Sequence, residues 1–401
     1  MVHGGRALAR DAQGEIVLVR GGLPGETVIA DVERRAGVRQ GTVVEVLEAS
    51  VDRVEALLHP GLDLGFASYE AQLRLKREVV ADAVNRAGVP LPGDVPVVRA
   101  SPRVWGYRSA IQPATIQGRL GYRREGSGDV VVLDDDPTAN EALNAAWSTL
   151  LEVGIPRGVR EIAMRGNDEG EVLIAFVVER SDPSLHDQAH ALVKAGITGV
   201  ALAPFDPRGR FRSGKSRLAG ARSMLQAYGD VTLSVSATAF AQPNPGAAGA
   251  AFQTLASWLP GGERAVELFA GGGAIALHLT RRYDEVVAVE VAHESVTRGR
   301  RDAERLGVTN LRFERGDARR FHLPSADLIV VDPPRAGLAK PLRDALHASD
   351  ARTLAYVSCD VATWARDVAD LTTRGWRVRR MEPFDFQPHT HHLELVSLLE
   401  R

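Results

Sequence analysis

Residues 265–274 read Ala-Val-Glu-Leu-Phe-Ala-Gly-Gly-Gly-Ala, an apolar run that ends in three consecutive glycines. Glycine lets the backbone approach a ligand closely and adopt angles that other residues avoid. A helical pattern follows, so the stretch predicts a strand, a tight turn and the start of a helix. We expect Phe269, Gly271 and Gly273 to line a cofactor site at this turn. Dinucleotide-binding folds share such a turn, so the glycines alone do not identify the ligand.

Strand and helix patterns alternate from Arg264 to the end of the chain. This order predicts an α/β fold with a doubly wound, mostly parallel sheet, whose ligands bind beyond the carboxyl ends of the strands. A first strand at 265–269 is followed by further predicted strands at 286–290, 311–314, 328–331 and 354–358, and by two runs near Val378 and at 393–399.

Two acidic residues at predicted strand ends narrow the choice of cofactor. Glu290 ends the second strand, where a carboxylate can accept hydrogen bonds from both ribose hydroxyls of a nucleoside. Asp317 follows the third strand, where an adenine edge would lie. The order of glycine turn, Glu and Gly-Asp fits S-adenosylmethionine better than NAD.

The fourth predicted strand leads into Asp332-Pro333-Pro334-Arg335. Proline fixes its own backbone angle and restricts the residue before it, so this turn is stiff and projects the Asp332 carboxylate into the cleft. Methyltransferases that act on amino groups use a similar turn followed by an aromatic residue. Arg335 in that place argues against an amino-group substrate.

Cys359 is the only cysteine of the chain. A single cysteine excludes an internal disulfide, a cysteine-rich zinc site and an all-cysteine iron–sulfur cluster. A free thiol is most often a buried structural residue. Cys359 instead follows the fifth predicted strand, at the edge where the other site residues lie, and we therefore predict a catalytic nucleophile.

The residues before this sheet predict two further domains. Short apolar runs separated by glycines over residues 1–50 predict about five strands in a small OB-type barrel. Residues 70–87 have a helical pattern. The middle of the chain mixes strand patterns (130–133 and 172–178) with a helical one (184–195), and its basic loop at 207–217 could follow a phosphate backbone. We place the boundaries at 1–50, 51–235 and 236–401.

Composition restricts the class of protein only broadly. The chain has 401 residues and a net charge of −2, which does not by itself indicate a nucleic-acid partner. No apolar run reaches the roughly 20 residues of a membrane span, and the N-terminal residues lack the apolar core of a signal peptide. We expect a cytoplasmic protein with no membrane partner.

Taken together, these motifs resemble the RNA uracil-carbon-5 methyltransferase family over nearly the whole chain. Residues 1–50 are similar to its N-terminal TRAM domain, and the Asp332–Arg335 and Ser358–Asp360 motifs match its most specific ones. Further matches lie at Tyr69, Gln72 and Lys76, at Tyr107-Arg108-Ser109, at Phe240-Ala241-Gln242-Pro243-Asn244 and at His392-Leu393-Glu394.

The resemblance implies a function and a set of roles. The fold would be a Rossmann-like class I methyltransferase sheet with a central α+β RNA-recognition domain. The cofactor would be S-adenosylmethionine, bound in part by Gln242. The reaction would be methylation of a uridine at carbon 5 in ribosomal or transfer RNA, with Glu394 as general base and Asp332 orienting the base or the donor. We expect a monomer that binds the uridine flipped out of its stack.

The chain departs from the family pattern in one place that bears on cofactors. Many members carry a four-cysteine iron–sulfur site, and this chain has His59-Pro60-Gly61-Leu62 and Asp136 at the matching positions. We expect no such cluster. Ala274 replaces an Asn often found in the cofactor loop, and Ser109 replaces another Asn.

Two other functions stay open from the sequence. An RNA cytosine-carbon-5 methyltransferase has a similar sheet order, but such enzymes release their product with a second cysteine. A non-catalytic RNA-binding or RNA-folding protein could retain the fold, although Cys359, Asp332 and Glu394 are all intact. A DNA-directed enzyme fits the TRAM-like region less well.

Overall fold

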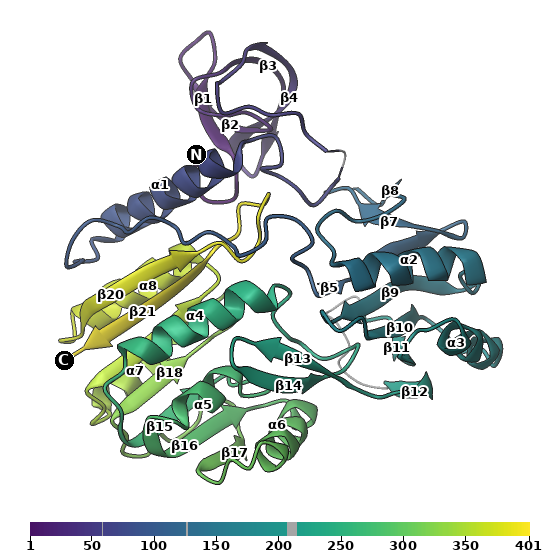
Figure 1. The fold of residues 1–401 in the computed structure, drawn as a ribbon. Helices are drawn as coiled ribbons and strands as arrows, with labels where there is room; N and C mark the ends of the chain where they lie inside the picture. Colours follow the sequence, from purple (N-terminus) through teal and green to yellow (C-terminus); the bar gives the residue numbers. More distant parts are fainter. Residues whose placement is uncertain (58, 126, 207–214) are drawn as a thin grey trace. The chain divides into compact units, whose positions relative to one another are not determined.

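The computed structural model describes residues 1–57, 59–125, 127–206 and 215–401 (Figure 1). These residues form two compact units. Unit 1 comprises residues 1–101, 264–268 and 318–401, and unit 2 comprises residues 102–263 and 269–317. Most of the basic loop predicted at 207–217 lies outside the described residues. The domain boundaries expected at residues 50 and 235 stay predictions.

Unit 1 begins with a small four-stranded sheet, one strand fewer than the sequence predicts. Its strand order is β1-β2-β4-β3, and register shifts between β3 and β4 mark irregularities that bend the pair. Among the residues that the structure describes, β3 and β1 at the two edges of this sheet are not paired with each other. The strands are β1 (Ala7–Arg10), β2 (Ile16–Arg20), β3 (Thr27–Arg35) and β4 (Val38–Glu48).

Helix α1 (Tyr69–Ala87) confirms the helical pattern predicted at 70–87. It begins where the Ser68 side chain accepts a hydrogen bond from the backbone of Ala71, and it ends at Gly88 in the left-handed conformation. Its buried face includes Gln72 and Lys76 together with apolar residues, and the helix packs against α8 (Val361–Thr372).

A seven-stranded sheet contains every strand predicted after residue 264, in the order β17-β16-β15-β18-β19-β21-β20. The pairs β15·β18, β18·β19 and β16·β17 are parallel, as expected, whereas β21 runs antiparallel to both β19 and β20. The strands are β15 (Gly262–Leu268), β16 (Tyr283–Glu290), β17 (Leu311–Arg315), β18 (Leu328–Val331), β19 (Thr353–Ser358), β20 (Arg377–Phe384) and β21 (Glu394–Glu400). The helices that follow these strands are α5 (Ala274–Leu279), α6 (His293–Arg305), α7 (Lys340–Ala348) and α8.

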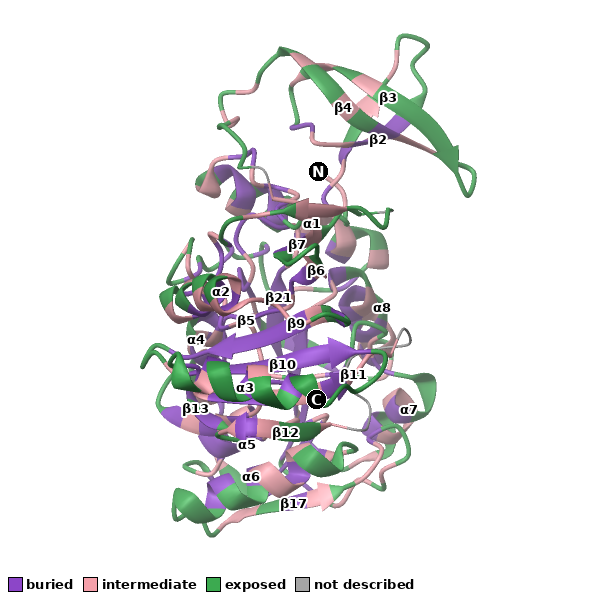
Figure 2. Cartoon of the chain, turned by 90° about the vertical axis from the view of Figure 1, so that its right-hand side faces the viewer, coloured by how far each residue is buried: buried purple, intermediate pink, exposed green. Residues whose placement is uncertain are grey.

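Unit 2 contains a second large sheet, with the order β12-β11-β10-β9-β6-β7-β8 and with β5 also paired to β9. Strand β10 is buried along its whole length, whereas α3 shows an exposed face to solvent (Figure 2). The strands are β5 (Ala110–Ile111), β6 (Ala114–Ile116), β7 (Arg119–Arg123), β8 (Val130–Val132), β9 (Val159–Gly166), β10 (Val172–Val178), β11 (Gly199–Pro204) and β12 (Ser216–Gly220). The other elements are α2 (Glu141–Val153), α3 (Ser184–Lys194), the hairpin β13 (Met224–Tyr228) and β14 (Val231–Val235), and α4 (Pro245–Trp258).

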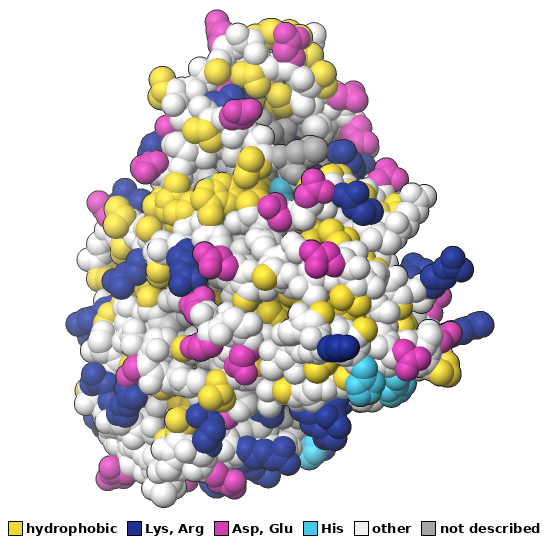
Figure 3. All heavy atoms as spheres, turned by 45° about the vertical axis from the view of Figure 1, so that its right-hand side comes forward, with side chains coloured by type: hydrophobic (Ala, Val, Ile, Leu, Met, Phe, Trp, Pro, Cys, Tyr) yellow, Lys and Arg dark blue, Asp and Glu magenta, His cyan; other side chains and the backbone are white. Residues whose placement is uncertain are grey.

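The described residues include no helix that is both long and apolar enough to cross a membrane. Lys and Arg side chains alternate with Asp and Glu on the face drawn in Figure 3. This mixture agrees with the small net charge of −2.

Candidate active site

The glycine turn of unit 2 has the unusual backbone that the sequence predicts. Phe269, Gly271 and Gly273 have φ angles of +62°, +55° and +86°. Positive φ is strained for a residue with a side chain, so Phe269 is held there by its surroundings. A Cβ at Gly273 would lie 2.5 Å from the ring of Phe313, whereas one at Gly271 would meet no atom within 4 Å. Gly273 is therefore required for packing, and Gly271 leaves open space beside the turn.

Glu290 ends β16 and fixes this turn directly. One carboxylate oxygen accepts a hydrogen bond from the backbone N–H of Gly271 at 2.9 Å, and the other accepts one from Ala292 at 2.7 Å. Asp317 follows β17, and the backbone of Gly316 donates to the Glu290 carbonyl at 3.0 Å. The structure thus brings together three predicted cofactor positions: the glycine turn, Glu290 and the Gly316-Asp317 segment.

Gln242 lies in the loop before α4. Asn244 ends that loop and caps α4, with its side-chain oxygen accepting from the backbone of Ala247 at 3.0 Å. The backbone N–H of Ser109 donates to the Pro243 carbonyl at 2.7 Å. Two segments singled out in the sequence, at 107–109 and 240–244, are therefore neighbours in space.

Asp136 of unit 2, which the sequence analysis matched to a cysteine position of the family pattern, is buried in a polar cluster. It is 1% exposed, and one of its oxygens accepts hydrogen bonds from the backbone and hydroxyl of Thr138, at 2.8 and 2.6 Å. The other oxygen accepts from the Tyr122 hydroxyl at 2.6 Å. Asp136 thus serves as a hydrogen-bond acceptor within the fold of unit 2.

Cys359 directly follows β19 and lines a cavity of about 90 Å³ in unit 1. Arg335, from the turn after β18, lines the same cavity, as do Asp360, His391 and His392. Glu394 begins β21 and is 5% exposed. The structure therefore gathers Cys359 and the Asp332–Arg335 turn at one edge of the sheet.

Burial and mutual repulsion favour the neutral forms of Cys359, Asp332 and Glu394. Burial, together with the charges of Glu394 and Asp332, raises the pKa of the Cys359 thiol to about 12, and Arg335 opposes this effect. Burial raises the pKa of Asp332 to about 7. Burial and the neighbouring Asp332 hold the pKa of Glu394 well above its ordinary value, again opposed by Arg335. Arg335 is thus the guanidinium that favours both the thiolate and the carboxylate.

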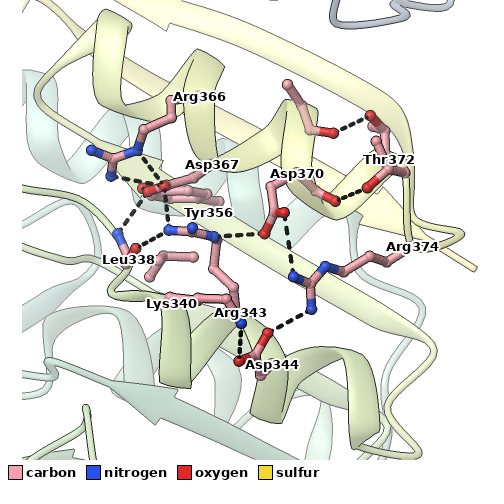
Figure 4. A network of polar contacts seen from close by, with 12 residues as sticks. Leu338, Lys340, Arg343, Asp344, Tyr356, Arg366, Asp367, Asp370, Thr372 and Arg374 are labelled. Atoms are coloured by element: carbon pink, nitrogen blue, oxygen red, sulfur yellow. Dashed lines mark hydrogen bonds and ion pairs between the residues drawn. The ribbon is translucent and has the colours of Figure 1, made fainter.

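The Asp332–Leu338 turn is held by Asp367 of α8, a residue that the sequence analysis did not single out (Figure 4). One Asp367 oxygen accepts from the backbone of Leu338 at 2.6 Å and from the Tyr356 hydroxyl at 2.9 Å. The other accepts from Arg343 at 3.1 Å. A Cβ at Gly337 would lie 2.4 Å from Asp367, so the turn depends on this glycine. No local motif marks the contact of Asp367 with this turn, because Leu338 lies 29 positions away in the sequence.

Helix α1 holds the loop that precedes β21. Lys76 is 2% exposed and donates to Asp385 at 2.7 Å and to the Gln387 carbonyl at 3.3 Å. His391 in the same loop is paired with Asp63, whose other oxygen accepts from the His391 backbone at 2.9 Å. Burial lowers the pKa of His392 to about 4, with His391 and Arg335 adding to the effect. His392 is therefore a neutral wall of the cavity at physiological pH.

Comparison with known proteins places this arrangement in a family. The family model for tRNA (Uracil-5-)-methyltransferase matches residues 230–401. The 23S rRNA (uracil(1939)-C(5))-methyltransferase RlmD of Halomonas elongata is 32% identical, in an alignment that covers 100% of this chain and 88% of that protein. The chain belongs to the RNA uracil-C5 methyltransferase family. An uncharacterized RNA methyltransferase of Streptomyces coelicolor is 31% identical over 100% of this chain and 91% of its own length.

A solved structure has the same fold as this chain. It is the Pyrococcus abyssi tRNA (uracil-54, C5)-methyltransferase in complex with S-adenosyl-L-homocysteine. The TM-score is 0.80 at 23% identity, with 98% of this chain and 100% of that chain covered. The likeness confirms the Rossmann-like methyltransferase fold that the family resemblance implies.

Proposed function

We propose that this protein transfers a methyl group from S-adenosylmethionine to carbon 5 of a uridine in ribosomal or transfer RNA. The observation that carries the proposal is Cys359, the single cysteine, in a cavity beside Arg335 and near two buried carboxylates. Membership of the RNA uracil-C5 methyltransferase family supports the same reaction. We expect the protein to act as a monomer in the cytoplasm, which size-exclusion chromatography and fractionation would test.

The residues of unit 2 fit the methyl donor. The backbone of the glycine turn faces open space at Gly271, and the Glu290 carboxylate lies against it at hydrogen-bond distance. Glu290 would bind the ribose hydroxyls, Asp317 the adenine, and Gln242 the rest of the donor, with the turn from Phe269 to Gly273 beneath it. When bound, S-adenosylmethionine supplies an electrophilic methyl group. Asp332 would orient the base or the donor.

The residues of unit 1 supply the covalent chemistry. Carbon 5 of uracil is a poor nucleophile, so the Cys359 sulfur adds to carbon 6 and the electron pair moves toward carbon 5, which then takes the methyl group. Glu394 removes the proton from carbon 5. The sulfur leaves carbon 6 as the ring double bond re-forms. Arg335 favours the ionised thiol and carboxylate that these steps require.

Methyl transfer from labelled S-adenosylmethionine to unmodified ribosomal and transfer RNA would test this function. We expect label in 5-methyluridine, in one of the two RNA classes. Label in cytidine would contradict the uracil assignment. Measurable donor binding without transfer to either RNA class would favour a non-catalytic RNA-binding protein.

A further inference from the structure

The segment His3–Gly5 forms one wall of the cavity that contains Cys359. It lines that cavity together with Arg335 and His392. The segment is folded back on itself, because Val2 donates to the Arg6 carbonyl at 2.9 Å and Gly5 donates to the Val2 carbonyl at 3.2 Å. Residues far from the nucleophile in sequence therefore belong to its immediate surroundings.

Gly5 allows this segment to pack closely against its neighbours. It is buried and has a φ of +70°, and a Cβ there would lie 2.8 Å from the His391 Cβ and 3.1 Å from an Asp63 oxygen. Side chains cannot approach that closely, so only glycine fits without moving the neighbours. The wall is thus packed against the same loop that carries His391 and His392.

His3 places a basic group next to the carboxylate that follows the nucleophile. Its Nε2 lies 3.3 Å from an oxygen of Asp360. The other Asp360 oxygen accepts from the backbone of Thr363 at 2.8 Å and caps α8. The hydrogen bond to Asp360 raises the pKa of His3, and the pairing lowers the pKa of Asp360. An ionised Asp360 opposes ionisation of the adjacent thiol, and a protonated His3 offsets that charge.

We propose that His3 is a positioning residue for the methyl-transfer reaction, which pairs with Asp360 to complete the wall around Cys359 and to offset the carboxylate charge beside its thiol. The inference rests on the proposed function of Cys359 as nucleophile. The titratable side chains that line the cavity with His3 are Cys359 and Asp360 after β19, Arg335 after β18, Lys76 on α1, and His391 and His392 before β21. Among these, Asp360 is the partner of His3.

The single cysteine allows a test that needs no RNA. Iodoacetamide alkylates a thiolate far faster than it alkylates a thiol or any other side chain, and Cys359 is the only cysteine of the chain. His3→Lys and His3→Gln both remove the imidazole but differ in charge. The ratio of their alkylation rates therefore separates the effect of charge from the effect of reagent access to Cys359. At pH 7 we expect His3→Lys to react about three- to tenfold faster than His3→Gln. The exposed His190→Gln should match wild type. Equal rates for the two His3 variants would overturn the proposal.

Methyl-transfer kinetics separate this inference from the proposed function. The His3 charge is present below its raised pKa and is lost as pH rises through it. The advantage of wild type over His3→Gln in kcat should therefore be largest near neutral pH and fall toward alkaline pH, while His3→Lys keeps its activity there. An inactive wild type would contradict the proposed function. An active wild type with identical pH profiles in all variants would contradict only the role of His3.

Discussion

The side-chain amide of Gln72 contacts both the backbone and the ring of His389. Its oxygen accepts from the His389 backbone N–H at 2.7 Å, and its nitrogen lies 3.1 Å from Nδ1 and 2.9 Å from the Ala67 carbonyl. His389 is buried and has a φ of +65°, a strained value for a residue with a side chain. Gln72 thus fixes the loop that leads into β21 and its first residue, Glu394.

Replacing Gln72 with Ala should loosen this loop. The substitution removes the hydrogen bonds that Gln72 makes with the backbone of His389 and Ala67, and each such bond contributes about 1 kcal/mol. We expect a lower free energy of unfolding in urea and a lower kcat with little change in donor affinity. Glu78→Ala, on the exposed face of the same helix, is the control. A Gln72→Ala protein as stable and active as the control would show that the loop holds itself.

Replacing Cys359 with Ala should abolish methyl transfer. The thiol is the only group in the chain that can form a thioether with carbon 6 of uracil. The proposed donor site is the glycine turn, which does not include Cys359, so the Kd for S-adenosylmethionine should stay close to that of wild type. Nucleoside analysis and calorimetry measure the two effects. Residual turnover near the wild-type rate would exclude the covalent route.

Replacing Glu394 with Gln should stop the reaction after methyl transfer. The amide has almost the same shape but cannot take the carbon 5 proton. We expect a covalent protein–RNA adduct to accumulate, visible as a band of reduced mobility in denaturing gels. Glu400→Gln, at the other end of β21, should leave turnover unchanged. Free 5-methyluridine formed at the normal rate would assign proton removal to another group.

Much of the fold could be predicted because its signals are local. The glycine turn, the apolar runs of β15 to β19 and the helical pattern of α1 each lie within a few residues, and the structure contains all of them. The small N-terminal sheet was less predictable, since register shifts between β3 and β4 interrupt the alternation that marks a strand. The antiparallel orientation of β21 could not be predicted from its own residues, because their pattern does not indicate the direction of a strand.

The sequence could predict that Glu290, Asp332 and Cys359 lie at or directly after strand ends, where the structure places them. The supporting contacts were not. Asp367 reaches Leu338 across 29 positions of the chain, and Gln72 reaches His389 across 317. The role proposed for His3 could be inferred only from its short distance to Asp360 in the structure. Such contacts depend on tertiary packing, which no short motif encodes.

Asp332 should lower the stability of the fold as pH rises. Its pKa is about 7 in the folded protein, against an ordinary value of 3.8. Below about pH 4, Asp332 is mostly protonated in both the folded and the unfolded protein. Stability is lost between about pH 4 and 7, because Asp332 ionises in the unfolded chain before it ionises in the folded protein. Asp332→Asn removes this loss, so we expect it to raise the free energy of unfolding by about 2–4 kcal/mol at pH 8 and by little at pH 4.

Asp350, a carboxylate whose pKa is lowered rather than raised, provides the control for that measurement. The hydrogen bond from Ser325 lowers the pKa of Asp350, so Asp350→Asn should reduce stability at pH 8. Urea unfolding at pH 4 and pH 8 measures both variants. Equal effects of Asp332→Asn at the two pH values would show that burial does not penalise its charge.

Replacing Glu290 with Gln should weaken donor binding more than it weakens the fold. The carboxylate accepts hydrogen bonds from Gly271 and Ala292, and an amide nitrogen cannot accept either of them. The glycine turn would lose one anchor, and the ribose would lose an anionic acceptor worth about 1.5–3 kcal/mol. We therefore expect the Kd for S-adenosylmethionine, measured by calorimetry, to rise roughly 10- to 100-fold. Glu285→Gln, near the start of the same strand, is the matched control and should bind the donor like wild type. If the two variants bound equally well, the donor would lie elsewhere than at the end of β16.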